Sequence, residues 1–438
     1  MSNTQLPNGW LEVPLGKYTI NKDGKRLPIS ATQRENRKGS IPYYGATGKI
    51  DSLDDFTHEG ENILVGEDGA NLISRNKNIA FIVNGKYWVN NHAHVICCYS
   101  GIPNSYLFYY LNSLVLDEWI TGSAQPKLTK SNLEAIPVKV PPLAEQKEIA
   151  TLLDNLLAQV DTLKTRLDAI PNILKRFRQS VLAAAVSGKL TEEWRTENTK
   201  HEWEYKTIGD VCAVATGKTP SRSESSYWDN GTVPWLTSAA TGDAFTVYAK
   251  EYITALAVSE CQLKKFEPGT LLLAMYGEGK TRGQVTELKL SATCNQACAA
   301  ITVNESIINR KFVKIRLQEN YEETRKAAAG GNQPNLNLSK VREIPIPLPP
   351  IEEQEEIVRR VEELFAFADQ IEQRVKVAQQ RVNHLTQAIL AKAFRGELTA
   401  EWREQNPDLI SGENSAVALL ARIQASNSNN VKASRHSK

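Results

Sequence analysis

The chain has 438 residues, enough for about two to four domains, and its 41% hydrophobic and 23% charged residues are typical of a soluble protein with packed cores. Its net charge of +2 neither requires nor excludes a nucleic-acid partner. It has no apolar run of about 18 residues and no apolar signal-peptide core at its start, and its six cysteines follow neither CxxC nor disulfide-framework spacing. We therefore expect a cytoplasmic protein with reduced thiols and no membrane partner.

Residues 1–140 are expected to form a first α/β domain. Short apolar runs between residues 63 and 98 predict strands, and residues 105–112 predict a helix. Between residues 17 and 49, eight basic residues stand against two acidic ones, which gives a local charge of +6. Such a cluster is typical either of a surface that binds an anionic partner or of a solvated loop.

Residues 141–195 predict a long helix. The Pro141-Pro142 pair prevents an earlier start, because a residue before proline avoids the α region. Gly188 marks the helix end, and Pro171 is expected to kink the helix. Apolar residues recur in alternating steps of four and three, the heptad pattern of a coiled coil, over about 43 residues or roughly 65 Å. These positions are Ile149, Leu153, Leu156, Val160, Leu163, Leu167, Ile170, Leu174, Phe177 and Val181.

The rest of the chain repeats this plan. Residues 196–348 predict a second α/β domain, with strand-like runs between residues 270 and 301 and a helix over residues 309–317. Residues 349–403 predict a second long helix that carries the same heptad. Residues 404–438 form a C-terminal tail that becomes polar and low in complexity from residue 424, so we expect it to be partly disordered.

The two halves are copies of each other. Residues 122–195 align with residues 330–403 at a constant offset of 208 without a gap, and 27 of the 74 positions are identical. This length indicates a duplicated half-protein, since solenoid repeats have periods of about 20–50 residues. The globular regions align only loosely, with Trp10 matching Trp203. We therefore expect a pseudo-two-fold molecule with antiparallel long helices and diverged globular copies.

We identify no catalytic set in the sequence. Residues 274–281 match a loose phosphate-loop pattern, but Arg282-Gly283-Gln284-Val285 predicts a turn into a strand where that loop requires a helix. ATP binding through Lys280 is therefore the least favoured interpretation. His92 and His94 lack a nearby cysteine or acidic pattern, so no metal site is expected. The sequence favours a binding protein without enzymatic activity of its own.

Residue types that read DNA are present in the loops of both globular regions. Arg and Lys pair with guanine, Asn and Gln pair with adenine, and hydroxyl groups beside basic residues suit phosphate contacts. The DNA-contact candidates of the first region are Lys25, Arg26, Arg34, Tyr43, Tyr44, Arg75 and Lys86. Those of the second region are Lys218, Thr219, Ser221, Arg222, Trp235, Thr237, Ser238, Lys280, Arg282, Asn295 and Gln296. A structural role is an equal alternative for each, and Trp228 and Trp235 are alternatively core aromatics.

A family resemblance rests on short stretches that occur in order. They are Ser40–Gly48 (SIPYYGATG), Leu64–Gly69 (LVGEDG), Val233–Ser238 (VPWLTS), Met275–Gly283 (MYGEGKTRG), and the helix starts Pro141–Gln146 (PPLAEQ) and Pro349–Gln354 (PPIEEQ). With these motifs, the chain resembles the specificity (S) subunit of type I restriction-modification systems over residues 9–403. The resemblance implies an α+β fold in which two α/β target-recognition domains are separated by a long antiparallel two-helix coiled coil.

The resemblance also implies the partners. They are double-stranded DNA, which the two domains read as a bipartite site, two modification (methyltransferase) subunits, and restriction (translocase) subunits. S-adenosylmethionine, ATP and Mg are then cofactors of the partner subunits, and no cofactor is expected in this chain. Because the globular copies differ, we expect an asymmetric target with an unread gap of fixed length. The alternative is a coiled-coil adaptor that joins proteins without contacting DNA, which the heptads alone fit equally well.

Overall fold

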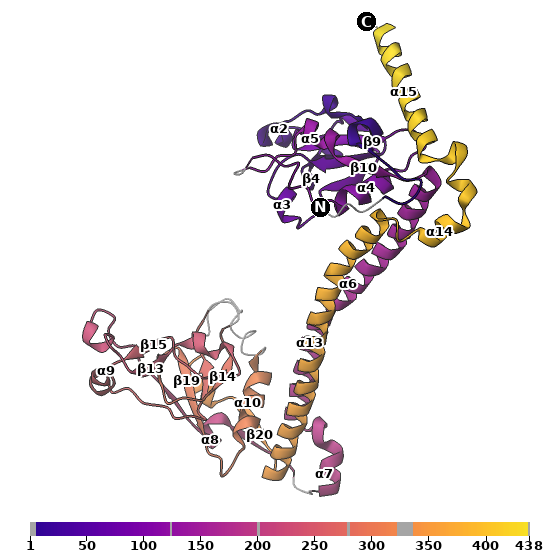
Figure 1. The fold of residues 1–438 in the computed structure, drawn as a ribbon. Helices are drawn as coiled ribbons and strands as arrows, with labels where there is room; N and C mark the ends of the chain where they lie inside the picture. The colour runs from indigo at the N-terminus through magenta and orange to yellow at the C-terminus, as the bar shows by residue number, and fades with distance from the viewer. Residues whose placement is uncertain (1–5, 123–124, 199–201, 278–280, 322–335, 437–438) are drawn as a thin grey trace. The chain divides into compact units, whose positions relative to one another are not determined.

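The computed structural model describes residues 6–122, 125–198, 202–277, 281–321 and 336–436 (Figure 1). The chain divides into two compact units. The first unit is Met1–Asp168 with Val377–Lys438, and the second unit is Ala169–Lys376. Each unit therefore combines one globular domain with parts of both long helices, whereas the sequence predicted the helices as segments of their own.

The first domain, residues 11–140, packs short helices against small sheets. One sheet has the strand order β2-β9-β6-β7, a second has the order β4-β3-β8-β5, and β1 pairs with β10. The strands are β1 (Leu11–Pro14), β2 (Thr19–Asn21), β3 (Lys38–Gly45), β4 (Gly48–Leu53), β5 (His58–Glu59), β6 (Asn62–Gly66), β7 (Ala80–Val83), β8 (Lys86–Val89), β9 (Ala93–Cys98) and β10 (Pro137–Val140). The helices are α1 (Leu15–Tyr18), η1 (Asp23–Lys25), α2 (Ala31–Glu35), α3 (Asn71–Ser74), α4 (Asn104–Ser113) and α5 (Lys130–Ala135).

The second domain, residues 204–348, repeats the plan with other loops. One sheet has the order β12-β19-β16-β17-β14, a smaller sheet has the order β15-β13-β18, and β11 pairs with β20. The strands are β11 (Glu204–Thr207), β12 (Cys212–Thr216), β13 (Val233–Leu236), β14 (Phe245–Thr246), β15 (Glu251–Ile253), β16 (Leu271–Ala274), β17 (Val285–Leu288), β18 (Thr293–Cys294), β19 (Cys298–Val303) and β20 (Pro345–Leu348). The helices are α8 (Ile208–Val211), η3 (Ser225–Tyr227), η4 (Ser238–Gly242), α9 (Ala255–Glu260), α10 (Arg310–Glu319) and α12 (Leu338–Arg342).

The register of the strands confirms the duplication. Leu11 faces Val140 in the first domain, and Glu204 faces Leu348 in the second. Leu11 and Glu204 at the domain starts are 193 residues apart in the sequence, and Val140 and Leu348 at the domain ends are 208 apart. These are the two offsets seen in the sequence. The predicted strands and the helices at α4 and α10 are also confirmed. The fold class expected from the sequence is therefore correct: two α/β domains accompany a long antiparallel helix pair.

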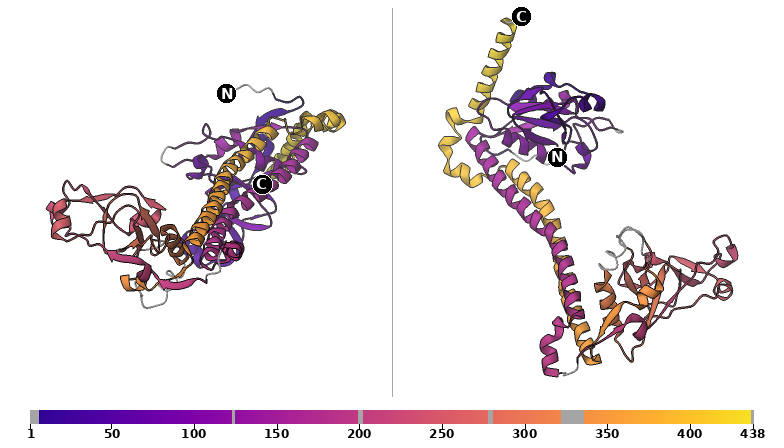
Figure 2. Two further views of the ribbon diagram at one scale, coloured as in Figure 1. Left: turned by 90° about the horizontal axis from the view of Figure 1, so that it is seen from below. Right: turned by 180° about the vertical axis from the view of Figure 1, so that it is seen from behind.

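The long helices α6 (Leu143–Val186) and α13 (Ile351–Phe394) lie side by side in every view (Figures 1 and 2). In the first unit Gln379 donates a hydrogen bond to Asp168 at 2.8 Å, and in the second unit Arg178 pairs with Asp369 at 2.6 Å. Further along α6, from Asp168 to Arg178, the partner on α13 lies earlier, at Asp369 instead of Gln379, which makes the pair antiparallel as predicted.

The heptad positions are not buried equally. Ile149, Val160 and Leu174 are buried, whereas Leu163 on α6 remains 46% exposed and the heptad residue Leu385 on α13 remains 40% exposed. The heptad pattern therefore predicts the helices correctly but overstates how much of the apolar stripe the pair covers. None of the described helices is long and apolar enough to cross a membrane.

The start of α6 is fixed by a buried carboxylate. Glu145 has no exposed surface, and it accepts hydrogen bonds from Trp10 Nε1 at 2.9 Å, Thr399 Oγ1 at 2.7 Å and Arg403 at 2.5 Å. The donors come from the first domain and from the chain just beyond α13. Arg403 also donates to the carbonyl of Gly396 at 2.7 Å, where the chain leaves α13 with a φ of +74° that glycine adopts without strain. We call this cluster the first clasp.

The second unit contains the same cluster at the start of α13. Glu353 is fully buried and accepts from Trp203 Nε1 at 2.8 Å, Thr191 Oγ1 at 2.7 Å and Arg195 Nε at 2.8 Å. Arg195 donates to the carbonyl of Gly188 at 2.6 Å. In this second clasp the residues beyond α6 hold the start of α13. Each repeat therefore completes the helix start of the other, and a buried charge with three donors is well compensated.

The chain after α13 forms further helices. After η2 (Lys189–Thr191) and α7 (Glu192–Asn198) in the first repeat, the second repeat continues through α14 (Ala400–Gln405), η5 (Pro407–Leu409), η6 (Gly412–Asn414) and α15 (Ala416–His436). Ala416, Leu419 and Ile423 are buried in the core of the first unit. The apolar residues before the polar segment anchor α15, which continues from residue 424 to residue 436.

We predict that Glu353→Ala lowers the free energy of unfolding of the second unit by about 3–5 kcal/mol, since it leaves the buried side of Arg195 and the indole N–H of Trp203 without their acceptor. Thermal unfolding of the full chain measures this. Glu352→Ala is the matched control, because Glu352 lies in the same helical turn but is exposed. Equal unfolding of the two variants would contradict a structural role for the clasp.

Candidate nucleic-acid interface

The smaller sheet of the second domain gathers many of the predicted contact residues at one edge. Strands β13 and β18 run parallel, with Trp235 facing Thr293. The segments that follow both strands therefore leave at the same edge. The backbone amide of Asn295 donates to the Leu236 carbonyl at 2.9 Å, which holds these segments together. This edge presents Thr237, Ser238, Asn295 and Gln296, and we call it the second reading edge.

The loop before β13 is pinned onto that edge. Gly217 passes so close to β18 that an added Cβ would lie 1.5 Å from the Cys294 carbonyl oxygen, which only glycine allows. Thr219 donates to the side chain of Gln296 at 2.7 Å. The indole N–H of Trp235 donates to the Lys218 carbonyl at 3.1 Å. The loop residues predicted to contact DNA are thus fixed on a sheet rather than free in solvent.

Arg222 and the tryptophans form a stack beside this loop. The guanidinium of Arg222 lies 3.8 Å from the ring centroid of Trp228 and 5.0 Å from that of Trp235. The two indoles meet edge to face at 5.2 Å, and Trp228 Nε1 donates to the Ser221 carbonyl at 2.9 Å. Trp235 is only 3% exposed, so the prediction that it contacts DNA is corrected: it is a core aromatic that supports Arg222.

The hairpin between β16 and β17 adjoins the same edge, since the amide of Met275 donates to the Ala297 carbonyl at 2.8 Å. Arg282 lies in this hairpin, and its buried Nε has no hydrogen-bond partner among the described residues. Lys280 lies outside the described residues. Thr281 is followed by a turn and then by strand β17, as the sequence predicted, so the helix that a phosphate loop requires is absent from described residues 281–288.

In the first domain, Arg26 is held in a largely buried charge network. It contacts Glu67 at 2.5 Å and Asp23 at 3.4 Å. His94 Nδ1 lies 2.7 Å from Asp23, and its Nε2 lies 2.8 Å from the Leu128 carbonyl. Both ring nitrogens of His94 therefore contact oxygen atoms, one of a side chain and one of the backbone. Arg26 therefore acts inside this network, a role that the sequence did not predict, and it fixes η1, which exposes Lys25.

The network also sets the charges of its acids. Burial alone would raise the pKa of Asp23, but hydrogen bonds from His94 and from the Val95 amide, together with the charges of His94 and Arg26, hold it below its ordinary value. Burial likewise acts to raise the pKa of Glu67, and the hydrogen bond from Arg26 with the charge of His94 lowers it overall. Both groups are therefore carboxylates at neutral pH.

Arg34 is stacked in the same way as Arg222. Its guanidinium lies 5.2 Å from the ring centroid of Tyr43, and its Nε lies 3.4 Å from Asp51. Tyr43 is 1% exposed, and Tyr44 packs against Phe81 with the ring centroids 5.8 Å apart. The prediction that Tyr43 contacts DNA is therefore corrected to a core role, and the ring of Tyr44 serves packing.

The remaining candidates of the first domain lie on other elements. Arg75 donates to the Asn112 carbonyl at 2.9 Å, and Lys86 lies 4.6 Å above the ring of Phe56. The basic cluster of residues 17–49 is also weaker than its sequence charge suggests. Acids beyond it neutralise part of it: Asp51 pairs with Lys38 at 2.8 Å, and Asp54 with Arg37 at 2.9 Å.

Sequence reasoning missed two acids, Asp51 and Glu251. Asp51 faces Tyr43, and Glu251 faces Trp235, each across an antiparallel strand pair. Asp51 also contacts Arg34, and Glu251 contacts Arg222. Acidic side chains are not expected at a DNA interface by charge alone, because DNA is anionic. Strand alternation alone does not reveal such pairs, since the partners are eight residues apart in one domain and sixteen in the other.

The described residues contain no group of three His, Cys, Asp or Glu side chains that could hold a metal ion. His92 pairs instead with Asp68 at 2.7 Å. The six cysteines are free, and Cys97 and Cys98 are buried in β9 as strand packing.

Comparison with known proteins defines the class. Residues 9–172 and 200–378 match the family model described as the type I restriction modification DNA specificity domain. The matches cover both domains and most of the long helices. The chain therefore belongs to this family, as the motifs in its sequence predicted.

Individual relatives span almost the whole chain. The type I restriction enzyme EcoKI specificity subunit of Escherichia coli (strain K12) is 40% identical over 465 residues, which covers 97% of each chain. The EcoDI specificity subunit of Escherichia coli is 34% identical over 454 residues, again covering 97% of each. The solved HsdS subunit from Thermoanaerobacter tengcongensis is 19% identical and shares the fold, with a TM-score of 0.56 over 90% of this chain and 99% of that one.

We predict that acid weakens the first domain through this charge network. Because the folded-state pKa values of Asp23 and Glu67 lie below their unfolded values of about 4, the carboxylates stabilise the fold above that pH, and the contribution is lost as the pH falls through the folded-state values. The difference in free energy of unfolding between wild type and Glu67→Gln should therefore be largest at neutral pH. It should shrink between about pH 5 and pH 2, by at most about 1.4 kcal/mol per pH unit.

Urea unfolding at a series of pH values measures this difference. The exposed Glu35→Gln is the control and should match the wild type throughout. A Glu67→Gln difference that stays constant with pH would show that the carboxylate charge of Glu67 is not what stabilises the network.

Proposed function

We propose that this chain is the DNA sequence-specificity subunit of a type I restriction-modification complex and has no catalytic activity of its own. The observation that carries the proposal is a duplicated frame whose two small sheets differ. The clasps and the β1–β10 and β11–β20 pairs are matched between the repeats, whereas the small sheets differ in length and loop composition. A frame held constant around variable loops is suited to presenting two different recognition surfaces.

The proposed DNA contacts follow from exposure and position. In the second domain they are the side chains of the second reading edge, the loop before β13 and the adjoining hairpin. In the first domain Lys25 is exposed and Arg34 is stacked for contact. The hydroxyl groups suit phosphates, whereas arginine and the amides suit base edges. The contacts proposed for the second domain are Lys218, Thr219, Ser221, Arg222, Thr237, Ser238, Arg282, Asn295 and Gln296.

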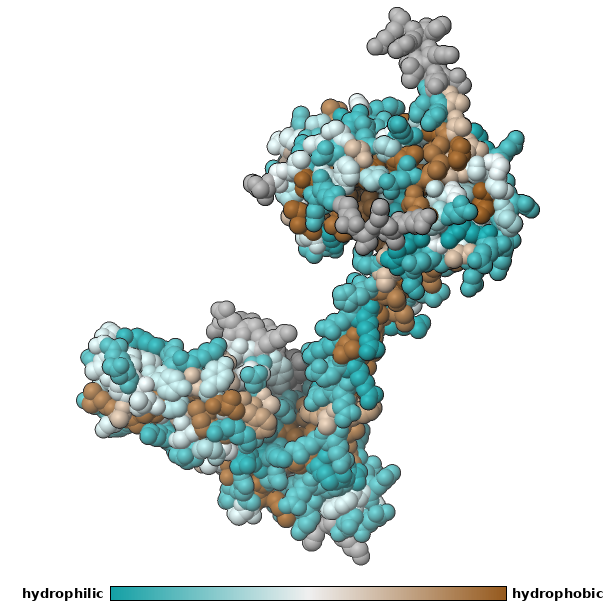
Figure 3. Space-filling view, viewed as in Figure 1, coloured by the Kyte–Doolittle hydropathy of each residue, from teal (hydrophilic) through white to brown (hydrophobic). Residues whose placement is uncertain are grey.

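The proposed protein partners are two modification subunits and the restriction subunits. Apolar side chains remain exposed on the long helices of each unit, with Leu163 and Leu385 in the first and Ile173 and Phe367 in the second. Figure 3 shows such hydrophobic patches among hydrophilic side chains on the visible face. Exposed apolar patches of this kind suit partner helices. S-adenosylmethionine, ATP and Mg would belong to these partners, and we place the assembly in the cytoplasm, where its DNA lies.

We predict that the chain, expressed with its modification subunits, directs adenine methylation to a split and asymmetric motif, because its two domains present different side chains. Single-molecule sequencing of genomic DNA from a methylation-free host measures this. The control is the same host with the modification subunits alone. A single undivided motif, or methylation that does not need this chain, would favour the protein adaptor without DNA contact.

We further propose that the long helices fix the unread gap between the half-sites. Inserting seven residues into each helix at the facing positions Asp168 and Gln379 keeps the heptad and adds about 10 Å at about 1.5 Å per residue. The preferred gap should grow by about three base pairs at about 3.4 Å each. Selection from a library of randomised gap lengths measures it, with the insertion in one helix alone as a mismatched control. If the double insertion still selected the original gap, the long helices would not be what fixes the gap length.

A further inference from the structure

An aromatic residue, an acid and an arginine are arranged in the same way in both domains, although the domain sequences have diverged. In the first domain, Tyr43 on β3 faces Asp51 on β4, and Arg34 lies over the ring beside that acid. In the second domain, Trp235 on β13 faces Glu251 on β15. Arg222 lies over the Trp235 ring and pairs with Glu251. We call this arrangement the stacked arginine pair. The surrounding loops differ in length, so the shared geometry is a feature of the small sheet itself.

The two copies differ in how open they are. In the first domain Lys38 binds both carboxylate oxygens of Asp51, at 2.8 and 2.9 Å, and the side chains of Arg34 and Asp51 are 21% and 22% exposed. In the second domain Arg222 Nη2 donates to Glu251 at 2.6 Å, and their side chains are 55% and 43% exposed. In the first domain the carboxylate of Asp51 is therefore shared with a second cation, Lys38, and we call this copy closed. In the second domain both Arg222 and Glu251 are exposed to solvent, and we call this copy open.

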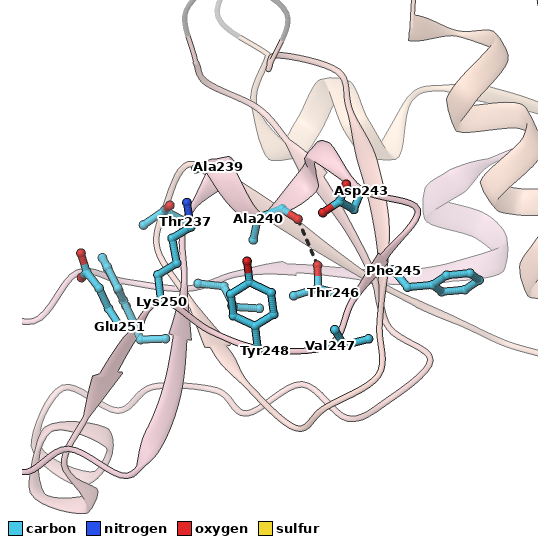
Figure 4. A pocket seen from close by; sticks show the side chains of 12 residues that line it. Thr237, Ala239, Ala240, Asp243, Phe245, Thr246, Val247, Tyr248, Lys250 and Glu251 are labelled. Atoms are coloured by element: carbon cyan, nitrogen blue, oxygen red, sulfur yellow. Dashed lines mark hydrogen bonds between the residues drawn. The ribbon is translucent and has the colours of Figure 1, made fainter. Parts of the chain in front are cut away.

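The open copy borders a cavity. Glu251 and Trp235 line it together with Thr237, Tyr248 and Phe245, and its volume is about 210 Å³. Figure 4 shows Glu251, Lys250 and Thr237 at one end and Phe245 at the other. Tyr248 is 62% exposed at this cavity. The flat, polar edge of a DNA base can therefore approach Glu251 without displacing core side chains.

The chemistry of the open copy fits a base edge better than a phosphate. The guanidinium and the carboxylate together carry little net charge, and the carboxylate repels a phosphate group. The same two groups complement a G·C pair, because arginine donates to O6 and N7 of guanine and a carboxylate accepts from the N4 amino group of cytosine. The contacts of the guanidinium with the rings of Trp228 and Trp235 restrict where it lies, which favours a bidentate contact.

We propose that Arg222 and Glu251 together read one G·C base pair in the half-site of the second domain, with Arg222 contacting guanine and Glu251 contacting cytosine. The closed copy in the first domain serves to hold its small sheet together. This inference rests on the proposed function and names the base pair that one part of the second domain recognises.

The test is selection of bound DNA from a randomised library by the full chain assembled with its modification subunits. Glu251→Gln replaces an acceptor oxygen with an amide donor, and Arg222→Lys keeps the charge but loses the bidentate fork. Both variants should lose about tenfold or more of the preference for G·C at one position of one half-site, with the other positions and the other half-site unchanged. The exposed pair should not be needed for folding, so thermal unfolding should stay near that of the wild type.

Glu305→Gln is the matched control, because Glu305 pairs with Arg310 at the same 2.6 Å in the same domain, and among the residues that the structure describes no aromatic ring lies against Arg310. It should leave the selected motif unchanged. An unaltered motif in Glu251→Gln and Arg222→Lys, or an equal loss of affinity for all sequences, would overturn the inference. Selection of no motif by the wild-type assembly would instead contradict the proposed function itself.

Discussion

A buried carboxylate at the start of each long helix is the constraint on which the fold depends. Glu145 and Glu353 are fully removed from solvent, so each needs several donors to offset the loss of hydration. No single segment supplies them. An indole N–H comes from the start of a domain, and a hydroxyl and a guanidinium come from the chain beyond the opposite helix. The clasp can form only when the helices run antiparallel and both repeats are present.

The clasps explain how the domains could diverge without loss of the frame. The supporting contacts are similar but not identical: Gln146 accepts from Tyr18, whereas its counterpart Gln354 accepts from the amide of Asn309. Both glutamines still donate at 2.8 Å to a proline carbonyl, that of Pro141 or Pro349. The helix start is thus preserved while the domain that packs on it changes. Loops on the small sheets then vary without disturbing the attachment of the domain to its helix.

The sequence predicted the features that depend on local pattern and on the repeat. Heptads, proline pairs and glycine ends located both long helices, and the constant offset of 208 predicted their antiparallel pairing. It predicted less of the interface, because contact residues depend on pairs far apart in sequence. Arg26 lies in a network with Glu67, 41 residues away, and Trp235 is covered by its own core. The sequence also did not predict α15, whose anchoring apolar residues lie before the polar segment.

The most direct test of the account is a double-mutant cycle between Glu145 and Arg403, measured by the free energy of unfolding of the full chain with Glu145→Ala, Arg403→Ala and both together. If the clasp joins the start of one helix to the chain beyond the other, the two changes should be non-additive by about 1–3 kcal/mol. Additive effects would show that the two residues stabilise the protein independently, and the clasp would then not be the constraint that holds the repeats together.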